Sequence, residues 1–324
     1  MTRLRHLAGA DAFILVLDGL VFAAFSILAP GFASIANIEN VLVSALPLLL
    51  LATGQTLVLV TGGIDLSAPS IVGLASVVGA IIMSSHAGWL GGHPLAAPIG
   101  LASMLVVGAA AGLVNGVSVA WFRMPPFMVT LASMTFCGGL AVWLARTFAQ
   151  SDSIDGLPAI VLAFGRGVSA AVLLALAAVA AAGVLLERTL LGRWMRAVGY
   201  NARTARVCGV PVKTVIISAF MLGGVFAALA GVLLTARLET GSPLHGRPLL
   251  LDVIGAAVIG GASLFGGRGT VVWTMCGVMF LALVSNGLML LNLSDFAVTI
   301  VKGAVILAAA LLDVWRTRWI SPDR

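Results

Sequence analysis

Charged residues are scarce in this sequence. They make up 9% of the 324 residues, whereas hydrophobic residues make up 60%. Soluble domains contain roughly 25% charged residues, so this composition excludes a soluble fold and makes lipid the main solvent of the protein surface. No Ser- or Pro-rich linker separates the apolar runs. We therefore expect one integral membrane domain over residues 1–324.

The residues that catalysis, metal binding and nucleotide binding require are missing or scattered. Cys137, Cys208 and Cys276 are too widely spaced for a disulfide framework or a zinc site, and no histidine forms a His-Glu-x-x-His pair. The lysines, Lys213 and Lys302, each follow a valine, so the sequence has no Gly-Lys-Ser/Thr loop for ATP. We expect no cofactor and no enzymatic activity.

The net charge of +6 does not indicate a nucleic-acid partner. The basic residues lie in short loops between apolar runs, and no aromatic residues are interleaved with them. Arg3 and Arg5 precede an apolar run, as they would in a secretory signal, but this run is longer than a typical signal core. We therefore expect it to remain as the first membrane helix.

Apolar runs long enough to cross a bilayer recur along the chain. A bilayer core needs roughly 20 residues of helix at about 1.5 Å per residue. The pattern predicts an all-α, polytopic membrane protein of about ten transmembrane helices. The predicted spans are 12–29, 41–60, 68–85, 95–120, 127–145, 168–186, 214–236, 249–265, 271–291 and 296–312.

The span at 249–265 is the weakest of these. It is short, begins close to Asp252 and contains Gly260 and Gly261. We expect a short or broken helix that belongs to the solute path. A re-entrant hairpin is the alternative, but removing one crossing would move the C-terminal arginines to the other side of the membrane.

The distribution of Lys and Arg predicts the orientation. With the N-terminus inside, thirteen of the eighteen basic residues fall on the inner side of the ten-span arrangement. Because cytoplasmic loops carry the excess of Lys and Arg, both termini are predicted to be cytoplasmic. The predicted cytoplasmic segments are the tails 1–11 and 313–324 and a long loop at about 187–213.

The segment from Gly62 to Ser67 interrupts two apolar runs. It contains paired glycines, Gly62 and Gly63, followed by Asp65 and Ser67, and Pro69 comes directly after it. One interpretation is a cytoplasmic turn in which Asp65 or Ser67 caps the next helix. The other is a discontinuous helix that lines a solute path, since freed backbone groups must face water, a cavity or protein.

The long hydrophilic loop contains a predicted short helix at 202–208. Asn201 is a favourable N-cap, and Gly209 is a favourable C-terminal stop. A helix of this length is unstable alone in water, so it needs a partner surface.

Arg203 and Arg206 share one face of this short helix, and Val207 offers an apolar contact. We expect these residues to dock on a cytoplasmic partner. The alternative, that the arginines only fix membrane topology, explains the charge but not the caps.

Gly108, Gly112 and Gly116 form a double Gly-x-x-x-Gly pattern in one span. Small residues let helix backbones approach closely in lipid, so this face is expected to pack on another helix of the same chain rather than on a second copy.

Lys302 is the lysine that lies inside a span. We expect it to reach toward Asp295 near the outer end, although a pore role stays open. Asp252 is expected to be isolated, and no two ionisable residues share helical spacing within one span, which argues against a proton relay.

Five stretches together resemble the ribose-type permeases of bacterial ABC importers. The resemblance covers nearly the whole chain and departs from the family at Ala68-Pro69, where Val-Gly is usual. The stretches are 62–67, 125–131, 199–206 with 209–210, 251–270 and 300–303.

The resemblance implies a multi-pass subunit of the bacterial inner membrane that moves a sugar or sugar-like solute. Its implied partners are a cytoplasmic ABC ATPase, a second permease subunit, a periplasmic solute-binding protein and membrane lipid. Gly63, Asp65 and Ser67 would lie at the core of the permease, whereas the loop with Asn201, Arg203 and Gly209 would meet the ATPase.

Other classes of function are a stand-alone secondary transporter or facilitator and, less favoured, an intramembrane enzyme. The capped cytoplasmic helix would have no explained partner in a stand-alone transporter. The sequence leaves open which solute is moved and whether the permease dimer is homomeric or heteromeric.

Overall fold

The structure, a computed structural model, describes residues 2–86 and 88–320. Its regular elements in these residues are all helical. They are α1 (Thr2–Leu28), α2 (Ile35–Val60), α3 (Ala68–Met83), α4 (Ala96–Ala120), α5 (Pro126–Phe148), α6 (Ala159–Arg166), α7 (Val168–Arg188), α8 (Leu190–Val207), α9 (Val212–Leu238), the 3-10 turn η1 (Arg247–Leu249), α10 (Leu250–Ile259), α11 (Val271–Leu290) and α12 (Asp295–Ile320).

The helices agree with the predicted all-α membrane fold. Six of them are long and apolar enough to cross a membrane: α2, α4, α5, α7, α9 and α11. Each of the ten predicted spans contains a helix, but α3 has 16 residues and α10 has 10. These lengths correspond to roughly 24 and 15 Å, less than the roughly 30 Å of a hydrocarbon core. Both short helices adjoin non-helical segments.

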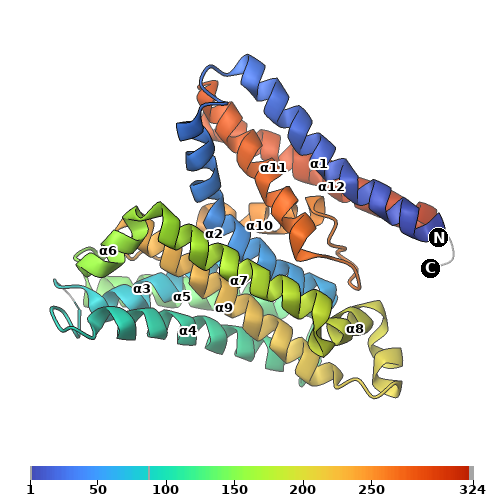
Figure 1. Cartoon of the computed structure of the whole chain (residues 1–324). Coiled ribbons are helices and arrows are strands. Elements are labelled where there is room, and N and C mark those ends of the chain that lie inside the picture. Colours follow the sequence, from blue (N-terminus) through green and yellow to red (C-terminus); the bar gives the residue numbers. More distant parts are fainter. Residues whose placement is uncertain (1, 87, 321–324) are drawn as a thin grey trace.

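The helix ends differ from the predicted tails. α1 begins at Thr2 and α12 continues to Ile320, so helix covers most of the predicted tails 1–11 and 313–324. Residues 321–324 of the second tail lie outside the described residues. α1 begins and α12 ends on the side of the molecule where α8 lies (Figure 1). We call this the α8 side and the opposite side, where α6 lies, the α6 side.

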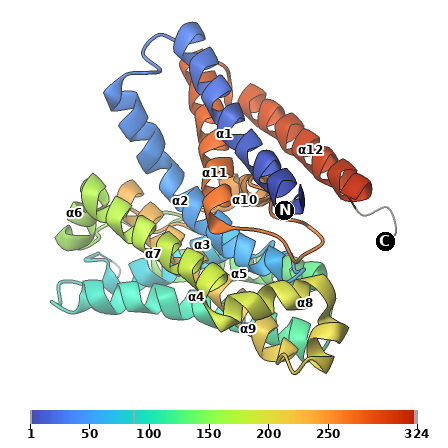
Figure 2. The same ribbon diagram turned by 45° about the vertical axis from the view of Figure 1, so that its right-hand side comes forward.

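The helices form a main body and an arm. In Figure 1, α3 to α9 lie close together in the body, while α1, α11 and α12 project away from it, and the turned view in Figure 2 shows the same division. α2 belongs to both parts because it starts beside α1 and α11 and ends deep in the body. It contains Pro47, which removes a helix hydrogen bond and permits a bend.

Glycines hold α4 and α9 at close range. A Cβ added at Gly108 would overlap the Gly224 carbonyl oxygen, and one at Gly112 would overlap that of Phe220. A Cβ at Gly116 would lie 2.8 Å from the Ile217 Cα. The double Gly-x-x-x-Gly face is therefore occupied by a helix of the same chain, and substituting a larger residue would separate the two helices.

Candidate functional site

The polar side chains of the break between α2 and α3 lie inside the protein, although Gly62 at its start is exposed. Asp65 is 3% exposed and Ser67 is fully buried. The Asp65 Oδ1 accepts hydrogen bonds from the Ser67 N–H at 2.8 Å and from the Ser67 hydroxyl at 2.5 Å. The Asn115 amide of α4 donates to the same hydroxyl at 2.9 Å. These bonds fix the turn to the α4 face of the body.

Side chains satisfy the backbone groups that the break frees. The Gln55 amide of α2 donates to the Asp65 carbonyl at 2.9 Å and accepts from the Asp65 N–H at 3.2 Å. The Thr130 hydroxyl of α5 donates to the Ile64 carbonyl at 3.2 Å, and the Gly63 N–H donates to the Val58 carbonyl. Non-helical backbone is tolerated at membrane depth under these conditions.

The cap expected at the start of α3 is absent. Ser67 is the N-cap residue, but its side chain makes no capping hydrogen bond to the first turn. The Asp65 carboxylate instead accepts a hydrogen bond from the backbone N–H of Ser67, two residues along the chain, which closes an Asx-turn. The expectation that Asp65 or Ser67 caps α3 through its side chain is therefore wrong, because both side chains are used to close the turn itself.

A second irregular segment follows α9 and connects the predicted spans 214–236 and 249–265. α9 ends at Leu238, its C-cap residue Glu239 has a φ of +59°, and residues 241–249 then run back along α3. A Cβ at Gly241 would overlap Ala80, one at Gly73 would overlap the Pro243 carbonyl, and one at Gly246 would overlap the Pro69 carbonyl. Glycine at these positions lets the extended chain lie directly on the helix.

Polar side chains anchor this re-entrant segment, residues 241–249. The Ser76 hydroxyl of α3 accepts from the Ser242 N–H at 3.1 Å and lies 2.6 Å from the Thr235 hydroxyl and 3.2 Å from the His245 Nδ1. At its start, Arg166 hydrogen-bonds Glu239 at 2.7 and 3.1 Å, which lowers the pKa of the Glu239 carboxyl.

The half-length helix α10 continues from the re-entrant segment and carries a charge pair. The Lys302 Nζ of α12 donates to the Asp252 Oδ2 at 2.6 Å, and the two side chains are 18% and 11% exposed. The expected partner of Lys302, Asp295, and the expected isolation of Asp252 are both wrong. The pairing joins residues 50 positions apart on different helices, so helical spacing within one span did not reveal it.

α10 ends at a glycine break that meets the first break. Gly260 follows Ile259, and Gly261 has a φ of +83°. A Cβ at Gly260 would overlap the Trp273 carbonyl of α11. The loop that follows returns to α2, where the Gly267 N–H donates to the Val60 carbonyl at 2.9 Å. The second break, at Gly260 and Gly261, is thus tied to the end of α2 by a backbone hydrogen bond.

α8 is a kinked helix rather than the isolated short helix that was expected. Helix starts at Leu190, and Asn201 interrupts it with a φ of −164°. The Asn201 side chain accepts from the Arg203 and Thr204 N–H groups at 3.0 Å each, so it is the expected N-cap. The residues from 190 to 200 were missed, and they supply part of the support that a short helix lacks.

The expected helix stop is also present at the end of α8. Gly209 has a φ of +82°, and the Val210 N–H bonds back to the Ala205 carbonyl at 3.0 Å, as in a Schellman motif. Ala205 is buried, whereas Arg203 and Arg206 are exposed and Val207 is 89% exposed. The end of α8 therefore presents a charged and apolar surface.

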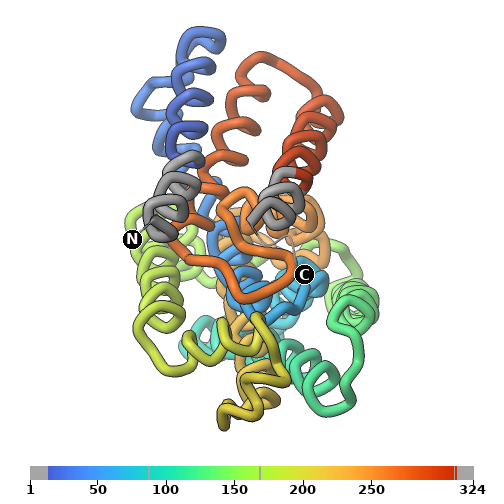
Figure 3. The backbone as a smooth tube through the Cα atoms, turned by 90° about the vertical axis from the view of Figure 1, so that its right-hand side faces the viewer, coloured from blue at the N-terminus to red at the C-terminus, as the bar shows by residue number. Residues whose placement is uncertain are grey.

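The kink of α8 lies against both breaks. A Cβ at Gly199 would overlap the Val60 carbonyl and the Gly267 N–H, and a Cβ at Gly266 would lie 2.8 Å from the Gly62 Cα. We name this meeting point, formed by Val60, Gly62, Gly199, Gly266 and Gly267, the glycine junction. In the view onto the α8 side, the loop between α10 and α11 lies beside the middle of α8 (Figure 3), where a Cβ at Gly267 would lie 2.7 Å from the Tyr200 ring.

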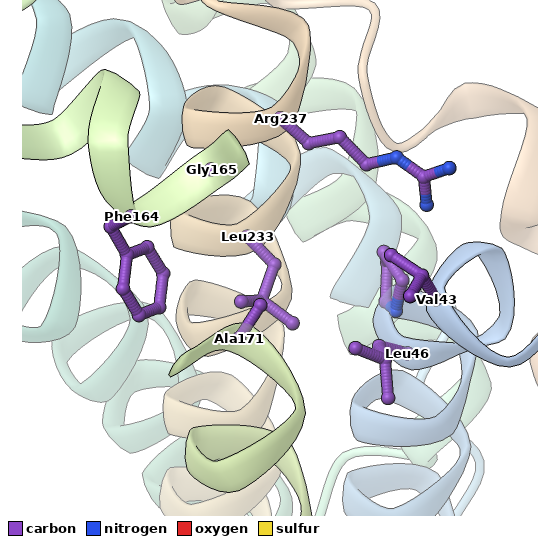
Figure 4. A pocket seen from close by; sticks show the side chains of 8 residues that line it. Val43, Leu46, Phe164, Gly165, Ala171, Leu233 and Arg237 are labelled. Carbon is purple, nitrogen blue, oxygen red and sulfur yellow. The ribbon is translucent and has the colours of Figure 1, made fainter. Parts of the chain in front are cut away.

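A small pocket lies elsewhere, between α2, α6, α7 and α9. Val43, Leu46, Phe164 and Leu233 line it, and the Arg237 side chain extends across its edge (Figure 4). The Arg237 guanidinium donates to the Ser44 hydroxyl at 3.0 Å. A hydroxyl-rich molecule needs several hydrogen-bond partners, so this apolar pocket is not a site for one.

Comparison with known proteins agrees with the helical pattern. The model of a family described as "Branched-chain amino acid transport system / permease component" matches residues 37–310. The Ribose import permease protein RbsC of Escherichia coli (strain K12) is 36% identical over 302 residues, which cover 91% of this chain and 90% of that protein.

Two further relatives cover a similar share of the chain. RbsC of Bacillus subtilis (strain 168) is 38% identical over 298 residues, which cover 89% of this chain and 88% of that protein. The L-arabinose transport system permease protein AraH of E. coli K12 is 33% identical over 313 residues, which cover 94% and 90%. No solved structure matches the chain.

Proposed function

The chain belongs to the family of branched-chain amino acid transport system permease components, and on that premise we propose that it is the permease subunit of a bacterial ABC importer for a sugar or sugar-like solute. Relatives named as ribose and L-arabinose permeases align over about nine-tenths of the chain. In this role the protein is a transport component of the inner membrane and not an enzyme.

The glycine junction is the observation that carries the mechanism. An importer must transmit ATPase motion from a cytoplasmic surface to helices that line the solute path. Here Gly199, next to the capped end of α8, touches Val60 at the first break and Gly267 after the second break. A shift of α8 therefore reaches both breaks through backbone contacts, without a flexible side chain between them.

The solute path is proposed to use the two breaks. Its residues are Gly62, Gly63, Asp65 and Ser67 on one side and Asp252, Gly260 and Gly261 on the other. Discontinuous helices line solute paths because unwound backbone is tolerated at membrane depth where it is buried or faces a cavity. The path is completed by a second permease subunit, and a periplasmic binding protein delivers the solute.

The topology proposed for this function has ten crossings and cytoplasmic termini. α1 begins and α12 ends on the α8 side, and the basic residues of α8 support a cytoplasmic location for that side, because cytoplasmic loops carry the excess of Lys and Arg. Lipid surrounds the arm and the outer faces of the body.

The end of α8 is proposed to dock on the cytoplasmic ATPase. Arg203, Arg206 and Val207 are exposed there, and Asn201 and Gly209 hold the helix ends. Losing a buried arginine contact at an interface costs about 2 kcal/mol or more, which weakens binding roughly thirty-fold.

Charge reversal tests the docking. The variant Arg203→Glu with Arg206→Glu is expected to lose ATPase co-purification, or to hydrolyse ATP without uptake, while its membrane insertion stays normal. Arg188→Glu with Arg193→Glu is the matched control, because it reverses the same charge in the same cytoplasmic region. If the first variant binds the ATPase and transports like the parent, or if both variants fail equally, the assignment is wrong.

A further inference from the structure

Arg247 lies well inside the body, next to the start of α3, rather than at the outer end of α9. Ser76 of α3 bonds to Thr235, three residues before the end of α9 at Leu238. The re-entrant segment passes Ser76 at Ser242 and reaches Pro69 at Gly246. Three residues of α9 and seven of α3 correspond to about 15 Å of helix, measured from the outer end of α9, which has 27 residues and is about 40 Å long.

The guanidinium of Arg247 is exposed and unpaired at this depth. Among the described residues, no ion pair or side-chain hydrogen bond involves Arg247. Three other arginines on the α6 side each have a partner: Arg146 binds Asp152, Arg166 binds Glu239 and Arg237 binds Ser44. The Asp252 carboxylate nearby in sequence is already paired with Lys302 at 2.6 Å.

An unpaired arginine at mid-depth cannot face hydrocarbon without a large cost. Insertion scales place this cost near 3 kcal/mol for a helix centre, and charged side chains there face a water-filled cavity or a partner. The non-helical backbone of the re-entrant segment has the same requirement. Arg247 and Pro248 are the exposed residues at its inner end, so no other part of the described chain covers the segment there.

A carboxylate from a second copy of this chain does not explain Arg247. The exposed acidic side chains among the described residues lie at helix ends or in connections, and they are Glu39, Asp152, Asp155, Glu187 and Asp295. Asp18 lies on α1, which packs against α11 of the same chain, and it is partly buried. None of these carboxylates is presented at mid-depth to a second copy.

We propose that Arg247 lines the solute path and binds an anionic group of the solute, so that the substrate class is an acidic sugar derivative that carries a carboxylate or a phosphate. The proposal rests on the proposed importer function. A guanidinium presents five donors in a planar fork that matches a carboxylate or phosphate in two parallel hydrogen bonds. A site built around that fork rejects a neutral analogue, because the guanidinium is then left without its counter-charge.

Thiol labelling at the neighbouring position tests whether the surroundings are aqueous and favour anions. Pro248→Cys is introduced after Cys137, Cys208 and Cys276 are replaced by alanine, and the complete importer is treated with anionic and cationic membrane-impermeant methanethiosulfonates. Val106→Cys is the control, because Val106 is 66% exposed in the middle of α4 and should face lipid. We expect labelling at residue 248 and none at residue 106.

The ratio of the anionic to the cationic labelling rate measures the contribution of the Arg247 charge. A full charge about 7 Å away in water changes each reagent's local concentration roughly threefold, in opposite directions. Arg247→Gln should therefore lower the anionic-to-cationic rate ratio at residue 248 severalfold, whereas Arg247→Lys should preserve it. Absence of labelling at residue 248 with and without ATP, or a ratio that Arg247→Gln leaves unchanged, overturns the proposal.

Solute-stimulated ATP hydrolysis separates this proposal from the importer function. With the complete importer in proteoliposomes, D-ribonate and D-ribose 5-phosphate are compared with neutral D-ribose. We expect stimulation by an acidic sugar that falls at least tenfold in Arg247→Gln and is partly kept in Arg247→Lys. If neutral D-ribose alone stimulates, and equally in Arg247→Gln, the substrate class is wrong while the importer function stands. If residue 248 shows no preference for the anionic reagent when Arg247 is present, and no tested sugar stimulates ATP hydrolysis, both the substrate class and the importer function are contradicted.

Discussion

The ion pair between Lys302 and Asp252 permits a quantitative prediction about α12. The Nζ and Oδ2 atoms are 2.6 Å apart, and the side chains are 18% and 11% exposed, so most of their water has been removed. Next to the pair, a Cβ at Gly255 would lie 2.5 Å from the Ile306 Cγ1. The contacts between α12 and α10 therefore include a charge pair and a close steric contact beside it.

Removing one charge should cost far more than removing both. Exposed ion pairs contribute about 0–1 kcal/mol, whereas loss of one partner of a buried pair costs about 3–5 kcal/mol because the other charge stays buried and uncompensated. With the small remaining exposure, we expect about 3 kcal/mol for Lys302→Met and for Asp252→Asn. This is roughly a 150-fold change in the folded-to-unfolded ratio.

The double variant Lys302→Met with Asp252→Asn should be more stable than the sum of the two losses predicts, by about 2 kcal/mol or more. Unfolding free energies from denaturant titration of the purified protein in mixed micelles measure the cycle. The exchanged pair, Asp252→Lys with Lys302→Asp, is a second check and should recover part of the stability. Additive single effects, or single losses below about 1 kcal/mol, would falsify the view that the pair is buried and coupled.

Three further predictions concern the breaks and the topology. Asp65→Asn should keep much more transport than Asp65→Leu, because an amide oxygen still accepts the two hydrogen bonds from Ser67 and the Asp65 Oδ2 has no partner among the described residues. Equal and complete loss of transport in both variants, with normal assembly, would show that the charge itself matters. Gly199→Ala should reduce coupled uptake at least tenfold, because the added Cβ overlaps the Val60 carbonyl. The control Gly139→Ala should keep normal uptake, because a Cβ at residue 139 meets open space. Comparable uptake in both variants would rule out a mechanical role of the glycine junction. A topology reporter fused after Arg324, which lies outside the described residues, should be active only in the cytoplasm; periplasmic activity would contradict the ten-crossing arrangement.

Much of the helical arrangement could be predicted because its signals are local. Apolar runs of sufficient length indicated all six helices that are long and apolar enough to cross a membrane, and Asn201 and Gly209 marked both ends of the capped segment. The preceding part of α8, from Leu190, was missed because it mixes arginines with apolar residues and its buried side chains, such as Met195, contact other helices. Only tertiary contact separates such a segment from a charged loop.

The re-entrant segment and the charge pair depend on contacts between distant parts of the sequence. Gly241 and Gly246 have the composition of an ordinary loop, and nothing local indicates that this loop descends along α3. A hint in the sequence is Gly73, a glycine in the interior of a helix, which leaves room for Pro243. Because Pro243 is far along the chain, the sequence alone does not connect the two residues. Asp252 and Lys302 are likewise 50 residues apart, so spacing within one span could not pair them.

The positions of the two breaks relative to α8 constrain how motion can spread. The Gly267 N–H is bonded to the Val60 carbonyl at 2.9 Å, and Gly199 leaves no room for a side chain between them. α8 therefore cannot move toward this bond without displacing the end of α2 and the loop after α10 together. A movement of this loop also moves α10, which binds α12 through Asp252 and begins three residues after Arg247. Motion at the α8 surface is thus expected to change the depth and direction of Arg247, whereas the α4–α9 glycine contact keeps the rest of the body fixed.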